Sequence, residues 1–593
     1  MLALLPLSTA WADVAINEAN FPDENFRNYL LSQSYGKDAV LTNAEIQGVL
    51  AMNLSKRNIQ SLQGIEFFTA LKGLHCYSNQ LTSLDISKNT ELTTLTCYSN
   101  QISSLDISKN TKLQQLGCGS NQLTSLDVSK NTELTLLYCY SNQLTTLDVT
   151  KNALLQQLRC YSNQLTSLDV SNNTALTLLH CYSNQLSSLD VSQNTALTSL
   201  YCYNNQLTSL DVSQNTALTS LHCYSNQLTS LDVTKNTALT SLYCYNNQLT
   251  SLDVTNNTAL TYLRCYSNQL SSLDVSQNTA LTSLYCHNNQ LTSLDVSQNT
   301  ALTSLYCYSN QLSSLDVSQN TELQQLRCNS NQLTSLYLNN SALKTLYCGS
   351  NQLTWLDVSN NTALTTLSCS SNLLSYLDVS RNTALTELDC YRNQLYSLDV
   401  TQNKELKKLY CFMNQLSMLY VSQNTALTDL RCWSNQLTSL DVSKNTALTY
   451  LNCGNNALGS LDVSGCTALT ELYCYVNQIY GAAMDALVQS LPSASDAKMY
   501  VINGENEQNS MTTSQVEAAK AKGWIPYYTD GVKDEYDGLI WKEYAGSDPS
   551  DITSVNADES DTSTYYDLSG RRISGKPGEK GLFVKDGKKV FVK

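Results

Sequence analysis

The sequence is poor in charge, and most of the charge it carries is negative. Only 14% of its 593 residues are Asp, Glu, Lys or Arg, and the formal net charge is −15. Because nucleic-acid phosphates require a basic face, this balance argues against a nucleic-acid partner. No apolar run reaches the roughly 20 residues that a bilayer-spanning helix needs. We therefore expect no anchoring of this chain by a transmembrane helix.

Motifs of common catalytic sites are missing as well. The sequence has no Gly-rich phosphate loop, no nucleophile elbow and no zinc-binding helix motif. A peptidase-like or glycosidase-like site would require a cluster of residues that depart from the repeating pattern of the sequence, and we find no such cluster. We expect a protein that is not an enzyme, holds no cofactor and has no metal site.

What the sequence has in abundance is one 21-residue unit. The copy that ends at Gln311 reads LTSLDVSQNTALTSLYCYSNQ. Its cysteine recurs in 21-residue steps from Cys76 to Cys328 and, after one 20-residue step, from Cys348 to Cys474. A period this short indicates a solenoid, in which each repeat is one turn around a continuous core. Function is then expected on a face of the array and not in a deep pocket.

Each repeat has two similar halves, Leu-x-x-Leu-x-Cys-x-x-Asn-x-Leu and Leu-x-x-Leu-Asp-Val-x-x-Asn-Thr. In both halves apolar residues alternate with outward ones, which predicts short strands on two faces. The Asn after each strand is expected to bond backbone groups at the bend.

Twenty of the 21 cysteines occupy one position of the repeat. Parallel strands about 4.8 Å apart hold their Cβ atoms farther apart than the ~3.8 Å that a disulfide prefers. We therefore expect buried thiols without disulfides. Cys466 is different, because it replaces the Asn of the Asn-Thr pair.

The segments around the array differ in composition. Residues 1–12 have the apolar stretch and small-residue end of a secretory signal peptide, although no Lys or Arg precedes the stretch. We expect the rest to divide as follows: an N-terminal cap and degenerate first repeat at 13–70, with helices at 22–32 and after Thr42; 20 turns at 71–478; an α/β cap at 479–544, with helices at 482–491 and 514–522 and strands at 499–502 and 524–528; an acidic linker at 545–564; and a small β module at 565–593.

The pattern around each cysteine resembles the leucine-rich repeat consensus. The 21-residue length and the cysteine ladder are most similar to the internalin J type of bacterial surface proteins and to related repeat proteins of Bacteroidetes. The resemblance implies a leucine-rich repeat solenoid of the α/β-class horseshoe type, curved and right-handed, with the strand Leu-x-Cys-x on the concave face. It also implies an adhesive or host-interacting role at the cell surface.

Two flanking segments carry further resemblances. INEANFPDENFRNYL is similar to N-terminal caps that often hold a calcium loop. Here Ser34, Gly36 and Ala39 stand where such a loop wants Asp, Asp and Gly, so we expect no calcium. The tail from DLSGRRIS to GLFVKDGKKVFVK resembles C-terminal sorting domains of the type IX secretion system of Bacteroidetes. This resemblance implies export and outer-membrane surface attachment through the tail. The alternative is a small β cap without a targeting role.

The two residues that flank each ladder cysteine point outward from one strand and build a continuous surface. Tyr, His and Arg dominate these positions, and such side chains suit recognition. We predict the ligand-binding residues there: Tyr138, Tyr140, Arg159, Tyr161, His180, Tyr182, Tyr201, Tyr203, His222, Tyr224, Tyr243, Tyr245, Arg264, Tyr266, Tyr285, His287, Tyr306 and Tyr308. Breaks at 117–119 and 327–370 bound this run. We expect a monomer that binds a host or matrix protein or a surface glycan.

Two alternatives stay open at this stage. The surface could capture a glycan for nutrient uptake by stacking on sugar rings, or the chain could be a spacer whose tyrosines only stabilise neighbouring turns. The second half of each repeat carries an aspartate ladder from Asp85 to Asp462. Its mutual repulsion would be relieved by Ser or Thr hydroxyls, by nearby lysines or by weakly bound cations.

Overall fold

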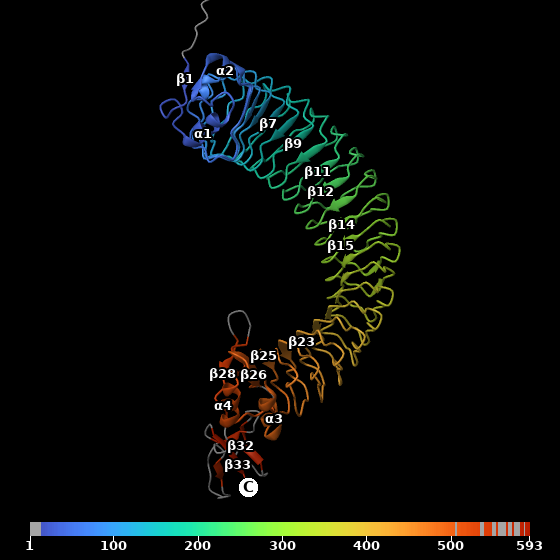
Figure 1. The fold of residues 1–593 in the computed structure, drawn as a ribbon. Helices are drawn as coiled ribbons and strands as arrows, with labels where there is room; N and C mark the ends of the chain where they lie inside the picture. Colours follow the sequence, from blue (N-terminus) through green and yellow to red (C-terminus); the bar gives the residue numbers. More distant parts are fainter. Residues whose placement is uncertain are drawn as a thin grey trace, which may run out of the picture. The chain divides into compact units, whose positions relative to one another are not determined.

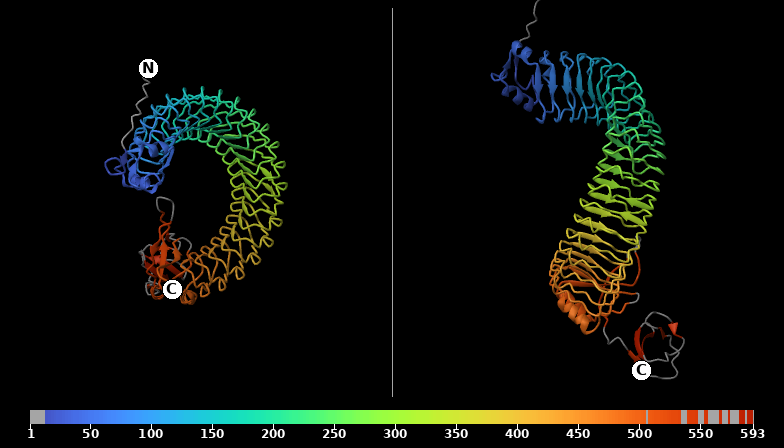
Figure 2. Two further views of the ribbon diagram at one scale, coloured as in Figure 1. Left: turned by 45° about the horizontal axis from the view of Figure 1, so that its top comes forward. Right: turned by 90° about the vertical axis from the view of Figure 1, so that its right-hand side faces the viewer.

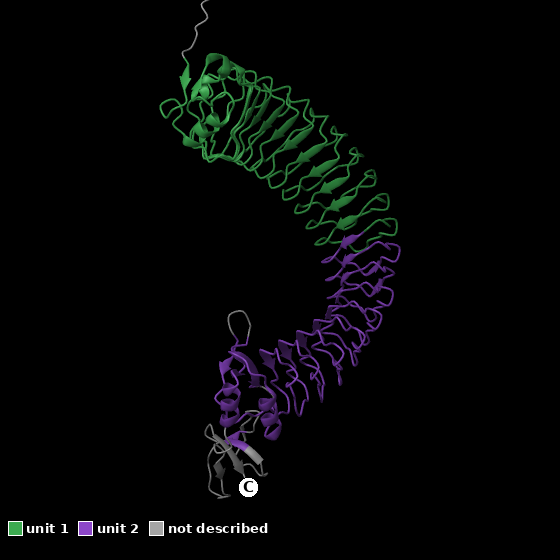
Figure 3. Cartoon of the chain, in the orientation of Figure 1, with its two compact units in different colours: residues 1–302 green, residues 303–593 purple. Residues whose placement is uncertain are grey.

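A computed structural model describes residues 13–504, 507–533 and 539–547 and the short segments 553–555, 565–566, 572–573, 581–585 and 588–592 (Figure 1). The predicted signal peptide and most of the predicted linker lie outside the described residues. The chain divides into two compact units, residues 1–302 and 303–593, coloured green and purple in Figure 3.

A small cap opens unit 1. Strand β1 (Val14–Ala15) pairs with β2 (Val40–Leu41), and helices α1 (Glu24–Ser32) and α2 (Asn43–Gly48) pack beside them. The helix predicted after Thr42 forms, and it begins with a capping box. The Glu45 amide donates to the Thr42 hydroxyl, and the Thr42 amide donates to the Glu45 carboxylate. Phe21, Phe26 and Phe68 are fully buried in this cap.

The repeats of unit 1 stack in parallel and in register. Leu200 lies opposite Leu179 and Leu221, and this residue-for-residue pairing holds throughout the unit. The strands line the inner side of the unit's curve (Figure 2). Their bounds are β3 (Ala51–Asn53), β4 (Gly73–His75), β5 (Thr94–Thr96), β6 (Gln115–Gly117), β7 (Leu136–Tyr138), β8 (Gln157–Arg159), β9 (Leu178–His180), β10 (Ser199–Tyr201), β11 (Ser220–His222), β12 (Ser241–Tyr243), β13 (Tyr262–Arg264) and β14 (Ser283–Tyr285), with a 3-10 turn η1 (Ile65–Phe67) after β3.

Unit 2 repeats the same arrangement and ends in helices. Its inner strands are β15 (Ser304–Tyr306), β17 (Gln325–Arg327), β19 (Thr345–Tyr347), β20 (Thr366–Ser368), β21 (Glu387–Asp389), β22 (Lys408–Tyr410), β23 (Asp429–Arg431), β24 (Tyr450–Asn452) and β25 (Glu471–Tyr473). The helices and strands predicted after the array form as α3 (Ala482–Ser490), β26 (Ala497–Asn503), α4 (Thr513–Ala521) and β27 (Trp524–Thr529), followed by β28 (Lys542–Glu543). β26 and β27 extend the inner sheet in parallel, and β28 pairs antiparallel with β27.

A separate sheet forms near the C-terminus. Its order is β29 (Thr553–Val555), β33 (Lys588–Val592), β32 (Gly581–Lys585), β30 (Tyr565–Tyr566) and β31 (Arg572–Ile573). β29 falls inside the segment predicted to be a linker, because the ladder of β33 offers it a free edge for parallel pairing. Residues 586–587, between β32 and β33, lie outside the described residues.

The core of each turn consists of leucine, cysteine and valine. In one turn of unit 1 the fully buried side chains are Leu197, Leu200, Cys202, Leu207 and Val212. Burying one such leucine contributes roughly 1.5–3 kcal/mol. The twenty ladder cysteines are buried thiols, as the spacing predicted, and Cys466 is a buried thiol as well. Burial raises the pKa of Cys97 to about 12, so these thiols are not nucleophiles at neutral pH.

Two asparagine ladders tie the turns together, as the sequence predicted. Asn184 Nδ2 donates to the carbonyls of Cys160 and Cys181 at 3.1 and 3.0 Å, and its Oδ1 accepts the Leu165 amide at 3.0 Å. In the other half-turn Asn194 Nδ2 donates to Val170 O and Asn173 O, both at 2.9 Å. Each side-chain amide therefore bonds backbone groups of its own turn or of the preceding turn. These groups lie at bends, where strand pairing gives them no partner.

The last turn is closed by side chains that imitate a further repeat. Asn509 Nδ2 donates to Cys474 O at 2.8 Å, and its Oδ1 accepts the Ile479 amide at 2.9 Å, as the ladder asparagines do. The Glu507 carboxylate accepts a hydrogen bond from the Val476 amide. In other turns the equivalent amide donates to a carbonyl of the following turn. Val476 is also held at a left-handed φ of 50°, which is strained for a β-branched residue.

The second face carries few paired strands. Among the described residues these are β16 (Ser314–Asp316) with β18 (Ser335–Tyr337), and single bridges that join Tyr420 to Asp399 and Asp441. On the outer side of a curve, successive turns are spaced more widely than on the inner side, so ladder bonds there are harder to form. Both sites of pairing include a turn in which Tyr replaces the usual Asp.

Candidate functional site

The residues that flank the ladder cysteines form two columns on the inner face of unit 1. We call the residues before each cysteine column A and those after it column B. From Tyr140 to His287, column B is an unbroken stack in which neighbouring ring centroids lie 4.2–4.7 Å apart and the ring planes differ by 7–12°. The rings of this stack are Tyr140, Tyr161, Tyr182, Tyr203, Tyr224, Tyr245, Tyr266 and His287.

From Arg159 to Arg264, column A of unit 1 consists of stacked aromatic rings flanked by two arginines. His180, Tyr201, His222 and Tyr243 stack at centroid distances of 4.1 Å. The Arg159 guanidinium lies 4.5 Å from the Tyr138 ring, and Arg264 lies between Tyr243 and Tyr285 at 4.6 and 5.0 Å. The structure thus brings together sixteen of the predicted site residues, Tyr138 to Tyr285 in column A and Tyr140 to His287 in column B. Tyr306 and Tyr308 lie in unit 2.

Stacking determines which parts of these rings a ligand can reach. Most column residues are half-buried. At spacings near 4.2 Å, each ring covers the face of its neighbour, so no ligand ring fits between them. Ring edges and phenol hydroxyls remain accessible. Sugar stacking, one of the two alternatives to protein binding, therefore lacks open ring faces within column B of unit 1.

Two histidines of column A are neutral at physiological pH. Burial lowers the pKa of His180 and of His222 to about 4, and the nearby charges of Arg159 and Arg264 act in the same direction. His180 Nε2 lies 3.2 Å from Ser199 Oγ. Between Arg159 and Arg264, column A therefore takes its positive charge from the arginines and not from these two histidines.

In unit 2 the columns are interrupted where the sequence predicted a break. Column A runs from Arg327 and Tyr347 through Ser368 to Asp389, and column B passes Gly349 and Ser370 before the stack of Tyr391, Phe412 and Trp433. The small residues leave a hollow of about 390 Å³. Its lining is Tyr308, Arg327, Asn329, Tyr347, Gly349, Ser350, Ser368, Ser370, Asp389 and Tyr391.

An exposed apolar patch on the second face of unit 2 was missed by sequence reasoning. Tyr376, Tyr396, Met418 and Tyr420 are 56–63% exposed and line a groove of about 470 Å³. Large apolar residues at three of these positions stand where most repeats have Thr or Ser, and Tyr420 stands where most have Asp. A scan for departures from the repeat at every position, and not only beside the cysteines, would have found them.

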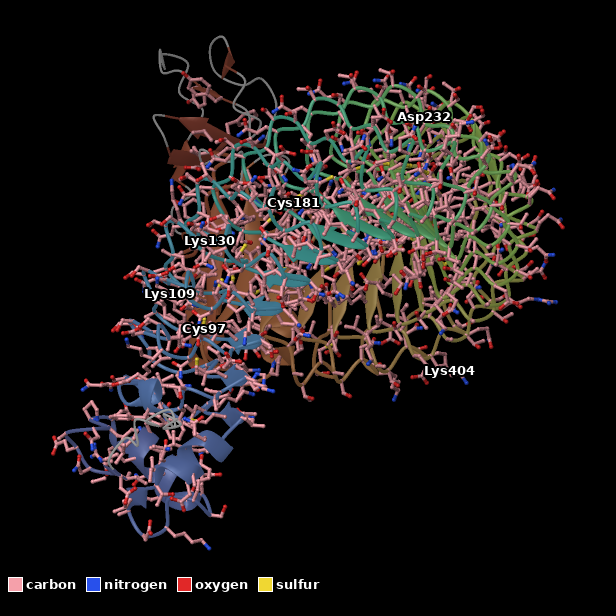
Figure 4. The ribbon with its side chains drawn as sticks, turned by 90° about the horizontal axis from the view of Figure 1, so that it is seen from above. Cys97, Lys109, Lys130, Cys181, Asp232 and Lys404 are labelled. Atoms are coloured by element: carbon pink, nitrogen blue, oxygen red, sulfur yellow. The ribbon has the colours of Figure 1, made fainter. Side chains whose placement is uncertain are left out.

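The aspartate ladder is relieved by local hydrogen bonds. Asp85 Oδ1 accepts the Ser87 amide at 2.9 Å, and Asp148 Oδ1 also accepts the Thr150 hydroxyl at 2.6 Å. These bonds lower the pKa of both carboxyls. Asp232, another ladder member, lies on the outer edge of unit 1 (Figure 4). Within the described part of the chain, no group of three or more His, Cys, Asp or Glu could hold a metal ion.

Comparison with known proteins places the chain in a family. Residues 279–320 match the model for leucine-rich repeats in two copies. The functional domain of InlJ from Listeria monocytogenes, whose structure includes a cysteine ladder, is 34% identical over 70% of this chain and 80% of that one, with a TM-score of 0.48. No protein of curated function matches the chain.

Two more distant structures share the fold. YopM from Yersinia enterocolitica WA-314 is 20% identical over 82% of this chain and 91% of that one, with a TM-score of 0.52. The plant peptide hormone receptor RGFR1, solved with RGF2, is 19% identical over 78% and 95%, with a TM-score of 0.51.

The parallel in-register strands and the buried Leu, Cys and Asn positions define a horseshoe-type repeat solenoid. The chain belongs to the leucine-rich repeat family, and its cysteine ladder makes it internalin-like. No helix in the described part of the chain is both long and apolar enough to cross a bilayer.

Proposed function

We propose that the chain is an exported cell-surface binding protein that recognises a protein ligand through columns A and B of unit 1. The observation that carries this proposal is the continuous ring stack from Tyr140 to His287 in column B, which lies beside the stacked rings of column A. Rigid tyrosines lose little conformational entropy on binding. Their hydroxyls suit the amides and polar side chains of a polypeptide, whereas a sugar would need the covered ring faces.

Surface display is supported by two further features. The functional domain of InlJ, 34% identical to this chain, also includes a cysteine ladder, and the repeat of this chain resembles that of internalin J-type surface proteins. The tail at 565–593 resembles type IX sorting domains, so we infer export, removal of the tail and attachment to the outer-membrane surface. Surface proteolysis with mass spectrometry tests this part: the repeat peptides should be released from intact cells without the tail peptides.

The binding proposal is tested on arrays of extracellular proteins and of glycans. The test variant carries serine at Tyr201, Tyr203, Tyr243 and Tyr245. A matched control carries serine at the exposed outer positions Gln193, Gln214, Lys235 and Gln277. We expect binding to a protein that the control retains and the test variant loses.

Three outcomes contradict the proposal. Undiminished affinity of the test variant would show that the inner face does not bind the ligand. Binding to glycans alone would favour nutrient capture, and binding to neither array would favour a spacer. Circular dichroism of both variants shows whether the solenoid is intact.

A further inference from the structure

The hollow in unit 2 lies where both columns lose their rings. In column A, Ser368 stands between Tyr347 and Asp389. In column B, Gly349 and Ser370 precede Tyr391, whose far face is covered by Phe412 at 4.4 Å. Tyr347 and Tyr391 therefore turn one ring face each toward the hollow, unlike the rings inside the column B stack. The space of about 390 Å³ between them is large enough for a long side chain of a ligand.

Asp389 gives the hollow its chemistry. Its Oδ2 accepts the Ser368 hydroxyl at 2.8 Å, while its Oδ1 is shielded from solvent and receives no hydrogen bond of normal geometry. In the described part of the chain no cation pairs with this carboxylate. Burial raises its pKa, although the Tyr391 amide and the Ser370 hydroxyl lower it in part. A half-buried carboxylate of this kind is stabilised by a cation from outside.

The chain itself shows which cation suits column A. Two turns beyond Asp389, the Arg431 guanidinium lies between the rings of Tyr410 and Tyr450, at 4.8 and 4.6 Å from their centroids. It also forms two hydrogen bonds of 3.0 Å with the Asp429 carboxylate. Ser368 also stands between a tyrosine ring, Tyr347, and an aspartate, Asp389. Its side chain is only a hydroxymethyl group, so no cation of the chain occupies this position of column A.

We propose that this hollow binds the guanidinium of an arginine side chain from a polypeptide partner. The guanidinium stacks on the open face of Tyr347 and donates to Asp389, at the level that Ser368 leaves empty. The aliphatic part of the arginine passes over Gly349 and Ser370 toward Tyr391. The net charge of −15 favours a basic ligand over long range. The site uses none of the unit 1 column residues and so stands apart from the function proposed above.

The test titrates the full chain with N-acetyl-L-argininamide and, as a neutral isostere, N-acetyl-L-citrullinamide. Saturation-transfer difference NMR gives both dissociation constants. Asp389→Asn removes the charge. Ser368→Tyr fills the hollow. Many other turns carry tyrosine at this position, so we expect the variant to fold. Asp357→Asn, an exposed ladder aspartate in unit 2, is the matched control.

We expect saturable binding of the arginine probe and at least about tenfold weaker binding of the citrulline probe. Asp389→Asn should weaken arginine binding by about the same factor, Ser368→Tyr should abolish it, and the control should leave it unchanged. Equal affinity for the two probes, an unaffected Asp389→Asn variant, or no saturable binding at all would each overturn the proposal. The tyrosine-to-serine variant of unit 1 should retain probe binding, which keeps failure of this site distinct from failure of the proposed function.

Discussion

Replacing Asn205 and Tyr203 separately distinguishes residues that hold the fold from residues that face a ligand. Asn205 Nδ2 donates to Cys181 O and Cys202 O at 3.2 and 3.0 Å, and its Oδ1 accepts the Leu186 amide at 3.0 Å. Asn205→Ala leaves three backbone groups without these partners. At about 1 kcal/mol or slightly more for each bond, the loss of unfolding free energy is about 3–4 kcal/mol.

Tyr203 makes a different kind of contact. Its ring stacks on Tyr182 and Tyr224, both at 4.2 Å, and it is half-buried. Such contacts contribute about 0.5–1.5 kcal/mol each when buried, so we expect Tyr203→Ser to cost about 1–2 kcal/mol. The asparagine substitution should therefore be more destabilising by about 2 kcal/mol.

Equilibrium urea unfolding in reducing buffer, followed by circular dichroism, measures both values. The slope of free energy against urea should stay constant between the variants, so that the midpoints compare directly. A loss in Tyr203→Ser that equals or exceeds the loss in Asn205→Ala would refute the reasoning. The tyrosine columns would then be a stabilising device, as in the spacer alternative.

Three further predictions follow from the core and the columns. Thiol titration with Ellman's reagent should find 21 thiols in denatured, unreduced protein and almost none that react in the native state; fewer than about 15 after denaturation would indicate disulfides and contradict the spacing argument. Cys466→Asn should raise the free energy of unfolding by about 1–2 kcal/mol, because Cys466 offers Val442 O only a thiol at 3.4 Å where the other ladder positions use an amide; a lower urea midpoint would count against the asparagine ladder. Since burial lowers the pKa of His180 and His222 from 6.5 to about 4, protonation favours the unfolded state and stability should fall as pH drops through that window. The variant with tyrosine at both histidines should lose that part of the pH dependence, and an identical profile would contradict the assigned pKa shifts.

The sequence predicted the fold in detail because the repeat reports each environment many times. Leu200, Cys202 and Asn205 recur at fixed offsets, and their burial and bonding follow from strand alternation and from backbone groups that need partners. The position of the break at 327–370 was equally visible. Composition could not show that neighbouring rings are almost parallel. This orientation is the reason that each ring covers the face of the next.

The hollow and the outer patch depended on depth and curvature. Asp389 looks like any outward strand residue in the sequence, and only the structure shows that its carboxylate is half-buried beside a hollow. The apolar patch around Tyr396 and Tyr420 could not be predicted from the residues beside the cysteines, because it lies on the second face and is assembled from substitutions in neighbouring turns. The second-face strands were predicted for every turn, whereas wider spacing on the outer side limits them to a few.

Contact between the inner columns of unit 1 and a protein ligand can be measured by site-specific photo-crosslinking. For this measurement p-benzoylphenylalanine is placed at Tyr203 on the inner face or at the exposed outer residue Gln214. We expect a crosslink to the ligand from position 203 and none from position 214. Crosslinking from position 214 alone would show that the ligand binds the outer side instead.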